Sequence, residues 1–249
     1  MTVVLYYFRK PVKKVNSFYM LIKQIKSMTE VSDACWNRLL QNQDPFLRHE
    51  FLLALEQSGS VSVKTGWNPH HLLVFEQQTL IAAMPLYLKS HSRGEYVFDQ
   101  QWADAYYQSG MEYYPKWVNA IPFTPCQGQR LLFEKSKDSR AIIQLCLANI
   151  KQLSEQHNIS SLHSLFPNLM QKEWLQEQLL IREGVQFQWR NKNYHDFADY
   201  LQTFTSRQRK NINKERRKVT EQGITLQRVS GLDISEQQWQ VFFLFYEMT

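Results

Sequence analysis

The sequence predicts an α+β fold in which a mixed sheet is flanked by helices. Two apolar runs, at 71–75 and 80–88, alternate as the arms of a β-hairpin around Gln77-Gln78. Residues 139–157 repeat their apolar positions at helical spacing over several turns. Strand-like and helix-like patterns then alternate to about residue 189, an order that is typical of a sheet with helices packed on it.

The first elements are expected to be helical. Residues 31–40 carry apolar side chains at helical spacing and predict a short helix. Asp44-Pro45 is a helix-start signal, with Asp44 as the N-cap and Pro45 in the first turn, and Gly59 is the matching stop. We therefore expect a second helix over 46–57.

The hairpin leads into a segment of unusual composition, residues 85–132. A turn is expected before residue 95, because Gly94 permits a positive φ. Residues 95–99 alternate as a short strand, with both acids on one face and both aromatic residues on the other. Asp99 is then expected to cap a helix that ends at Gly110.

The same periodicities predict the remaining elements. We expect strands at 117–122, 159–166, 185–189 and 224–229, and helices at 139–157, 168–180, 204–222 and 239–246. The helix over 204–222 has a narrow apolar edge and is otherwise cationic. The helix over 239–246 is apolar on most of its surface, so we expect it to cause instability or self-association, or to dock on further protein.

Residues 85–132 mix aromatic and ionic side chains instead of separating them. The aromatic residues are Tyr87, Tyr96, Phe98, Trp102, Tyr106, Tyr107, Tyr113, Tyr114, Trp117 and Phe123. Such a mixture is typical of the lining of a concave site. The alternative is a packed aromatic core with a capped helix, and this alternative requires a partner for every ionic group that is buried.

Charge is unevenly distributed along the 249 residues, whose formal net charge is +6. Residues 1–26 hold six basic residues and no acid, and residues 207–218 hold seven basic residues and one acid, so the remainder carries −6. The high isoelectric point thus reports two segments and not a generally basic surface. We interpret residues 1–28 as a poorly ordered basic extension, with a basic arm for an anionic surface as the alternative.

Composition and motifs exclude several functions. Hydrophobic residues make up 43% of the chain, which indicates a globular protein, and no apolar run has the length of a membrane span. The three cysteines are widely spaced, which favours a reducing cytoplasm. The sequence has no zinc-ligand spacing, GxSxG elbow, Walker loop or GxGxxG, so we predict neither a metal centre nor nucleotide hydrolysis.

Long ungapped words connect the sequence with a known family. They are Asp44–Leu47, Phe51–Gly59, Gly66-Trp67, Pro85–Ser92, Gly94–Asp99, Trp102–Ala105, Tyr113–Lys116, Pro122–Pro125, Gly128–Leu132, Gln208–Ile212 and Glu215–Arg217. On these words the chain from about Asp33 to Thr249 resembles the bacterial FemAB-like family of the GNAT acyltransferase superfamily, often labelled peptidoglycan biosynthesis or recognition proteins. Arg93 stands where the family usually has an aromatic residue, and Asn213 where it usually has a basic one.

The resemblance implies three regions. Residues 1–28 are a basic extension, residues 29–200 a first GNAT-like domain, and residues 201–249 a basic helix with the start of a second, incomplete GNAT-like domain. Members of the family usually continue into a complete second domain, so we expect this chain to be truncated and to have a missing C-terminal half as a partner.

The resemblance also implies a function. It predicts a cytoplasmic transferase that moves an acyl or aminoacyl group onto an amine acceptor, such as a cell-wall precursor, with acetyl-CoA or another acyl donor as cofactor. The alternative is a non-catalytic module, or a truncated remnant, that binds the acceptor or an anion. Nucleic acid stays open as a partner because of the basic helix, although the sequence has no RNA-module signature.

The candidate site residues fall into four groups. The candidates for general base on an acceptor amine are Glu95, Asp99 and His91. The candidates for substrate contact are Lys89, Tyr96, Trp102, Asp104 and Tyr106. The loop at 125–130 occupies the slot where GNAT enzymes hold the cofactor pyrophosphate, with Gly128 and Arg130 as candidate ligands. The candidates for anion binding are Arg207, Arg209, Lys210, Arg216 and Arg217, with a solvated helix paired to acids as the alternative.

Overall fold

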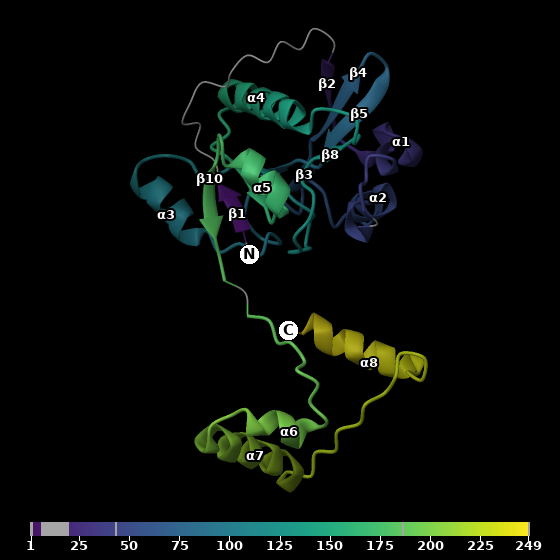
Figure 1. Cartoon of the computed structure of the whole chain (residues 1–249), viewed down its shortest axis with the longest axis vertical. Helices are drawn as coiled ribbons and strands as arrows, with labels where there is room; N and C mark the ends of the chain where they lie inside the picture. The colour runs from purple at the N-terminus through teal and green to yellow at the C-terminus, as the bar shows by residue number, and fades with distance from the viewer. Residues whose placement is uncertain (1, 6–19, 43, 186, 249) are drawn as a thin grey trace. The chain divides into compact units, whose positions relative to one another are not determined.

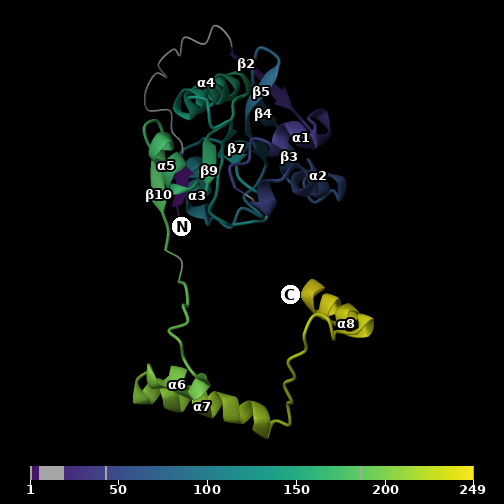
Figure 2. The same ribbon diagram turned by 45° about the vertical axis from the view of Figure 1, so that its right-hand side comes forward.

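The computed structural model describes residues 2–5, 20–42, 44–185 and 187–248. The chain forms two compact units, Met1–Gln186 and Phe187–Thr249 (Figures 1 and 2). Strands are confined to the first unit and are flanked there by helices in the described part of the chain, which confirms the α+β class. The domain limits expected at residues 28 and 200 stay predictions.

The elements of the first unit follow each other in mixed order. They are β1 (Thr2–Leu5), β2 (Met20–Ile25), the 3₁₀ helix η1 (Met28–Glu30), α1 (Asp33–Asn37), the 3₁₀ helix η2 (Pro45–Leu47), α2 (His49–Gln57), β3 (Trp67–Pro69), β4 (His71–Glu76), β5 (Thr79–Met84), β6 (Tyr87–Lys89), α3 (Gln100–Gln108), β7 (Lys116–Asn119), β8 (Leu132–Phe133), α4 (Ser139–His157), β9 (Leu162–Leu165), α5 (Leu169–Leu175) and β10 (Leu180–Glu183). The second unit contains α6 (Phe197–Gln202), α7 (Ser206–Glu221) and α8 (Glu236–Glu247).

Two sheets form the framework of the first unit. The larger has the order β10-β1-β9-β7-β6-β3, in which β7 and β9 run parallel and the other neighbours antiparallel. The smaller is antiparallel, with the order β2-β4-β5-β8. The run predicted as one strand over 80–88 is divided between the sheets, because Pro85 has no N–H to continue the ladder after Met84.

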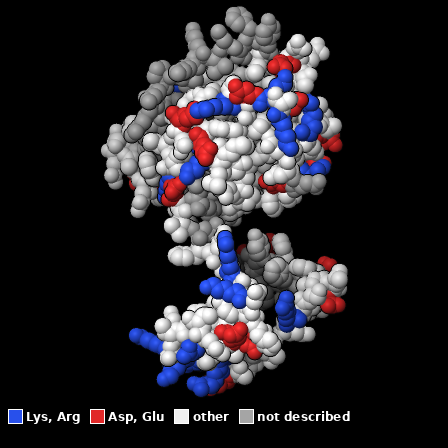
Figure 3. Space-filling view, viewed as in Figure 1, with Lys and Arg blue, Asp and Glu red and all other residues white. Residues whose placement is uncertain are grey.

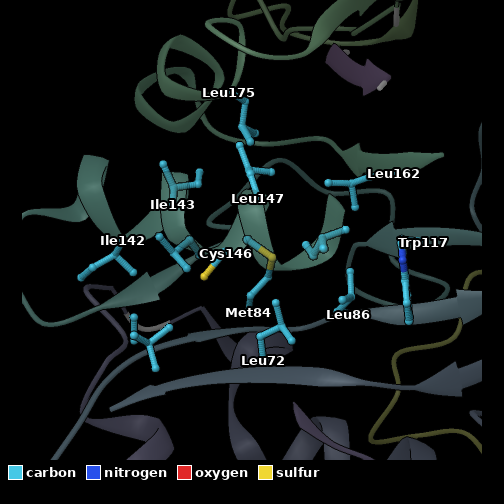
Figure 4. Close-up of a cluster of buried hydrophobic side chains, with 14 of the residues drawn as sticks. Leu72, Met84, Leu86, Trp117, Ile142, Ile143, Cys146, Leu147, Leu162 and Leu175 are labelled. Atoms are coloured by element: carbon cyan, nitrogen blue, oxygen red, sulfur yellow. The ribbon is translucent and has the colours of Figure 1, made fainter. Parts of the chain in front are cut away.

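Helix α4 has the bounds predicted from its periodicity, and Asp138 caps it by accepting hydrogen bonds from the N–H groups of Arg140 and Ala141. Its inward side chains pack with both sheets in one cluster (Figure 4). That cluster includes Leu72, Met84, Leu86, Trp117, Ile142, Ile143, Cys146, Leu147, Leu162 and Leu175. The opposite face of the smaller sheet is covered by α1 and α2, so β4 and β5 are buried on both faces and read as continuous apolar runs.

Three predicted strands are wrong. The described residues of 95–99, 185–189 and 224–229 are irregular. Tyr96 has φ +56°, which interrupts the extended backbone of the first segment. A strand forms instead five residues earlier, as β10, and the helix predicted over 168–180 accordingly ends at Leu175.

The basic extension was expected to be poorly ordered, and its described parts correct this. Thr2–Leu5 pairs with both β9 and β10, and Met20–Ile25 pairs with β4. In β2 half-buried and exposed positions alternate from Met20 to Lys23, and Ile25 at its end is buried. Arg9, Lys10, Lys13 and Lys14, which carry most of the charge of this segment, lie outside the described residues.

The second unit is helical. Thr205 starts α7 with a capping box that includes Gln208, and Ser235 starts α8 in the same way with Gln238. As predicted, α8 has exposed apolar side chains, with Phe242 at 61% and Phe245 at 62% exposure. None of the described helices has the length and apolar character needed to cross a membrane.

We predict that Gln171 stabilises the junction of α5 with the loop before β8. Its buried side chain accepts hydrogen bonds from the N–H groups of Arg130 (2.6 Å) and Leu131 (3.0 Å) and donates to the carbonyl of Leu131 (2.6 Å). Gln171→Ala leaves these main-chain groups unpaired, so urea denaturation should show a loss of about 3 kcal/mol in the free energy of unfolding. The control Gln176→Ala, at the exposed C-cap of α5, should change it by less than about 0.5 kcal/mol. Equal effects would contradict the assignment.

Candidate functional site

A buried lysine, Lys116, is the centre of a hydrogen-bond network in residues 85–132, the segment that mixes aromatic and ionic side chains. Lys116 Nζ donates hydrogen bonds to Glu95 Oε2 (2.9 Å), Asp99 Oδ2 (2.6 Å) and Ser92 Oγ (2.7 Å). The side chains of Lys116 and Glu95 are fully buried and that of Asp99 is 3% exposed. Burying an ammonium without partners costs several kcal/mol, and the two carboxylates offset that cost. We call Lys89, Glu95, Asp99 and Lys116 the acid–lysine cluster.

The sheet places the two lysines of the cluster side by side. Lys116 begins β7, and its direct cross-strand partner on β6 is Lys89, whose own partner on β3 is Trp67. Lys89 Nζ lies 3.7 Å from the centroid of the Trp67 ring and donates to the carbonyl of Arg93. Burial, together with the like charge of Lys116, lowers the pKa of Lys89 to about 7, although Glu95 opposes this shift.

Glu95 is held with one oxygen bound and the other without a partner. Oε2 accepts the hydrogen bond of Lys116, while Oε1 is buried and has no hydrogen-bond partner among the described residues. Burial raises the pKa of Glu95, against the attraction of Lys116. A carboxylate with a raised pKa and an unused oxygen is suited to accept a proton.

Asp99 occupies the N-cap position of α3, as predicted, but its side chain does not cap the helix. Instead, Oδ2 accepts hydrogen bonds from Lys116, from the hydroxyl of Tyr113 (2.8 Å) and from Ser92 Oγ (2.9 Å). Burial alone would raise the pKa of Asp99, but Lys116 and these hydrogen bonds outweigh it and lower the pKa. Asp99 therefore holds the cluster together as a carboxylate.

The other candidates from the sequence divide into buried and exposed groups. Tyr106 is buried, whereas Tyr96 (58%) and Trp102 (39%) are exposed, as is Asp104, which accepts a hydrogen bond from Gln100. The predicted separation of residues 95–99 into an acidic and an aromatic side holds without a strand, because both acids are buried and both aromatic side chains are exposed.

His91 is half-buried, and its Nδ1 accepts a hydrogen bond from the N–H of Arg93. A Cβ at Gly66 would lie 2.3 Å from His91 Nε2, so the glycine is needed for this close approach. Burial and the charge of Lys89 lower the pKa of His91.

Sequence reasoning missed Lys116, Tyr113 and Ser92 as members of the site. Lys116 could have been found because it lies between Pro115 and Trp117, at the start of an apolar strand. A lysine in a buried strand needs a counter-charge. His163 on β9 was also missed. One ligand atom each from Glu95, Asp99 and His163 lies within 4.8 Å of the other two, but Lys116 Nζ already binds both carboxylates, so we assign this place to the ammonium and not to a metal.

In the loop at 125–130, the groups expected to bind a cofactor pyrophosphate form hydrogen bonds with main-chain carbonyls instead. Each guanidinium nitrogen of Arg130 donates to a main-chain carbonyl, of Leu165, Gln129 or Cys126, and the side chain is buried. The N–H of Gly128 donates to the carbonyl of Phe166. These groups do not fit a pyrophosphate in this arrangement, and cofactor binding at the loop stays a prediction.

The candidate anion-binding residues lie on α7, where Lys and Arg side chains gather (Figure 3). Arg209 donates to the carbonyl of Phe204, Arg216 lies 4.4 Å from the centroid of the Phe197 ring, and Arg217 pairs with Glu221. Arg207 and Lys210 are exposed and form no ion pair with any acid that the structure describes.

We predict that Lys89 makes stability depend on pH. Because its pKa is lowered from 10.5 to about 7, the folded chain binds fewer protons than the unfolded chain between these values, and stability rises with pH in this window. The free energy of unfolding of the wild type, measured relative to Lys89→Met by denaturant titration, should therefore increase from about pH 7 to about pH 10. Lys135→Met, at an exposed lysine, is the matched control. If the difference in the free energy of unfolding between the wild type and Lys89→Met stays constant with pH, the pKa of Lys89 is not lowered.

Comparison with known proteins gives one family. The profile of the FemAB-like family, described as peptidoglycan biosynthesis and recognition, matches residues 27–249. No curated protein and no solved structure matches the chain. The matched range includes the acid–lysine cluster and α7, and it begins after β2. The chain therefore belongs to the FemAB-like family.

Proposed function

We propose that this protein transfers an acyl or aminoacyl group to a primary amine of a cell-wall precursor, with Glu95 as the general base. Family membership supports a role in peptidoglycan biosynthesis or recognition. The observation that carries the chemistry is the buried Glu95 with one unpartnered oxygen beside two lysines. An acceptor ammonium must lose a proton before it is nucleophilic, and a carboxylate with a raised pKa accepts that proton near neutral pH.

Glu95 is favoured over Asp99 by the direction of its pKa shift and over His91 by its unpartnered Oε1. Asp99 Oδ2 already accepts three hydrogen bonds, and its pKa is lowered, so it is a weaker base. His91 Nδ1 is occupied by the N–H of Arg93. In the proposed roles, Asp99 and Lys116 position Glu95, and Glu95 exchanges the proton.

The proposed reaction is balanced in atoms and charge. Glu95 Oε1 takes one proton from the acceptor ammonium, and the neutral nitrogen attacks the acyl carbonyl carbon. The new N–C bond forms as the bond to the leaving group breaks, and the attacking nitrogen gives its second proton to the leaving group. Glu95 releases the first proton to solvent, which restores the carboxylate. Because Gly128 and Arg130 have no donor group that fits a pyrophosphate, the proposal assigns the acyl donor no site on them.

The amine reaches Glu95 only when the covering loops move, because the Glu95 side chain is fully buried. Two loop residues next to Gly94 support such movement. Tyr96 (φ +56°) and Phe123 (φ +58°) hold a left-handed backbone without being glycine, and the N–H of Phe123 donates to the carbonyl of Gly94. Strained backbone of this kind is often found where a site opens and closes.

Glu95→Gln is the direct test of the proposed base. The amide keeps the shape of the side chain but takes up no proton, so the transfer rate should fall about 10²- to 10⁴-fold. The assay follows amide formation on a lysine-containing peptide amine, with acyl-CoA and aminoacyl donors in separate arms. Glu173→Gln, the same acid-to-amide change at an exposed position of α5, should retain the activity. Full activity of Glu95→Gln, or no transfer by the wild type with either donor, would overturn the proposal.

A second candidate function is anion binding by α7, without catalysis. It is favoured by the exposed cations of this helix, of which Arg207 and Lys210 have no acidic partner in the described residues. Its apolar edge of Phe204, Ile212 and Val219 is half-buried, which leaves the cationic side to solvent.

The anion-binding candidate predicts a charge-specific effect. The double variant Arg207→Glu and Lys210→Glu should bind labelled inorganic polyphosphate at least about tenfold more weakly and with a shallower salt dependence, as measured by fluorescence anisotropy. The control exchanges Lys64 and Lys135, exposed lysines of the first unit, for Glu, with the same change in net charge. If both double variants lose the same affinity, the net charge and not α7 is responsible.

A further inference from the structure

The second unit contains an aromatic pocket that the proposed transfer does not use. Its volume is about 470 Å³. The residues that line it are Trp189, Asn191, Tyr194, Asp196, Phe197 and Tyr200. A pocket of this volume has room for a small organic ligand.

The rings of the pocket hold one another in place. The centroid of Trp189 lies 6.4 Å from that of Tyr194 and 6.0 Å from that of Tyr200, and the two tyrosine rings are 5.2 Å apart. Despite these contacts, the Trp189 side chain is 65% exposed and Phe197 is 42% exposed. The cluster is thus a braced apolar surface that remains open to solvent, and such a surface binds a ligand without first being ordered.

Two polar side chains at the pocket are oriented by the backbone. Asn191 Oδ1 accepts a hydrogen bond from the N–H of Tyr194 (3.2 Å), which leaves its amide nitrogen as a donor. Asp196 Oδ1 accepts from the N–H of Asp199 (2.8 Å), and the other carboxylate oxygen lies 3.7 Å from His195 Nδ1. The pocket therefore combines an apolar surface with a fixed amide donor and a fixed acceptor.

The charges around the pocket favour an uncharged ligand. Asp196 lines the pocket and disfavours an anion. Arg216 already lies on the Phe197 ring at 4.4 Å, and the neighbouring residues Arg190 and Lys192 are basic, so a second cation is also disfavoured. A ligand that is neutral overall, with an apolar face and with hydroxyl or amide groups at its edge, satisfies all of these conditions.

We infer that this pocket binds a neutral carbohydrate, with the C–H face of an N-acetylated pyranose on Trp189 and its acetamido carbonyl accepting from Asn191. One face of a pyranose is apolar and its edge carries hydroxyl groups, which matches the rings and the Asp196 carboxylate. This inference does not rest on the transfer reaction. Binding is measured without turnover, so failure here and failure of Glu95 as base are distinguishable.

The test is calorimetric titration of the whole chain with N,N′,N″-triacetylchitotriose, with cellotriose as a second arm that lacks the acetamido groups. Saturable binding of the acetylated sugar is expected, and cellotriose should bind more weakly. Trp189→Ala should weaken binding about tenfold, since exposed aromatic anchors of this kind carry much of the binding energy. Asn191→Ala should remove the difference between the two sugars.

Phe187→Ala is the matched control, because Phe187 is 96% exposed and does not line the pocket. It should bind the sugar like the wild type, and circular dichroism should give the same helix content for all variants. The inference is overturned if the wild type does not bind the acetylated sugar, if Phe187→Ala and Trp189→Ala lose affinity equally, or if tetramethylammonium or uridine monophosphate binds the pocket more tightly than the sugar.

Discussion

The first unit depends on the burial of the Lys116 ammonium between two carboxylates. The lysine starts a strand in the interior of the larger sheet, and its side chain is fully buried. Glu95 and Asp99 come from the loop and helix start about 20 residues earlier, so their ion pairs hold this chain segment to the start of β7. Replacing one partner would leave an unpaired charge in the interior, which costs about 3–5 kcal/mol.

The cluster also explains why two acids so close together behave differently. Asp99 is surrounded by donors and stays ionised, whereas Glu95 has one bound oxygen and one that is buried without a partner. Environments that shift the pKa values of two carboxylates in opposite directions are typical of sites where one carboxylate positions its neighbours and the other exchanges protons. The exposed aromatic side chains of the same segment lie outside this buried group. The mixed aromatic and ionic lining expected from the sequence is therefore divided into a buried ionic cluster and exposed aromatic side chains.

Local patterns predicted the fold well where contacts are local. The bounds of α4 and the stop at Gly110 follow from periodicity and glycine, and α7 forms within two residues of its predicted bounds. The short strand at 95–99 was wrong, because alternation of burial also arises from a loop with a left-handed residue. The side-chain partners of Lys116 and Arg130 were not predictable, since they lie 17–24 and up to 35 residues away and no spacing rule encodes such distances. Arg130 was expected as a ligand of a cofactor pyrophosphate, yet its guanidinium donates to three main-chain carbonyls inside the protein.

The cross-strand pair of Lys89 and Lys116 has a consequence for how the family diverges. The two lysines are direct cross-strand partners, and Glu95 and Asp99 offset the positive charge that the pair carries, so the four positions form one electrostatic unit. A lineage that loses one member is left with an uncompensated charge in the interior until a second exchange restores neutrality. We therefore expect members of the family either to retain all four ionic residues or to replace them in pairs of opposite charge.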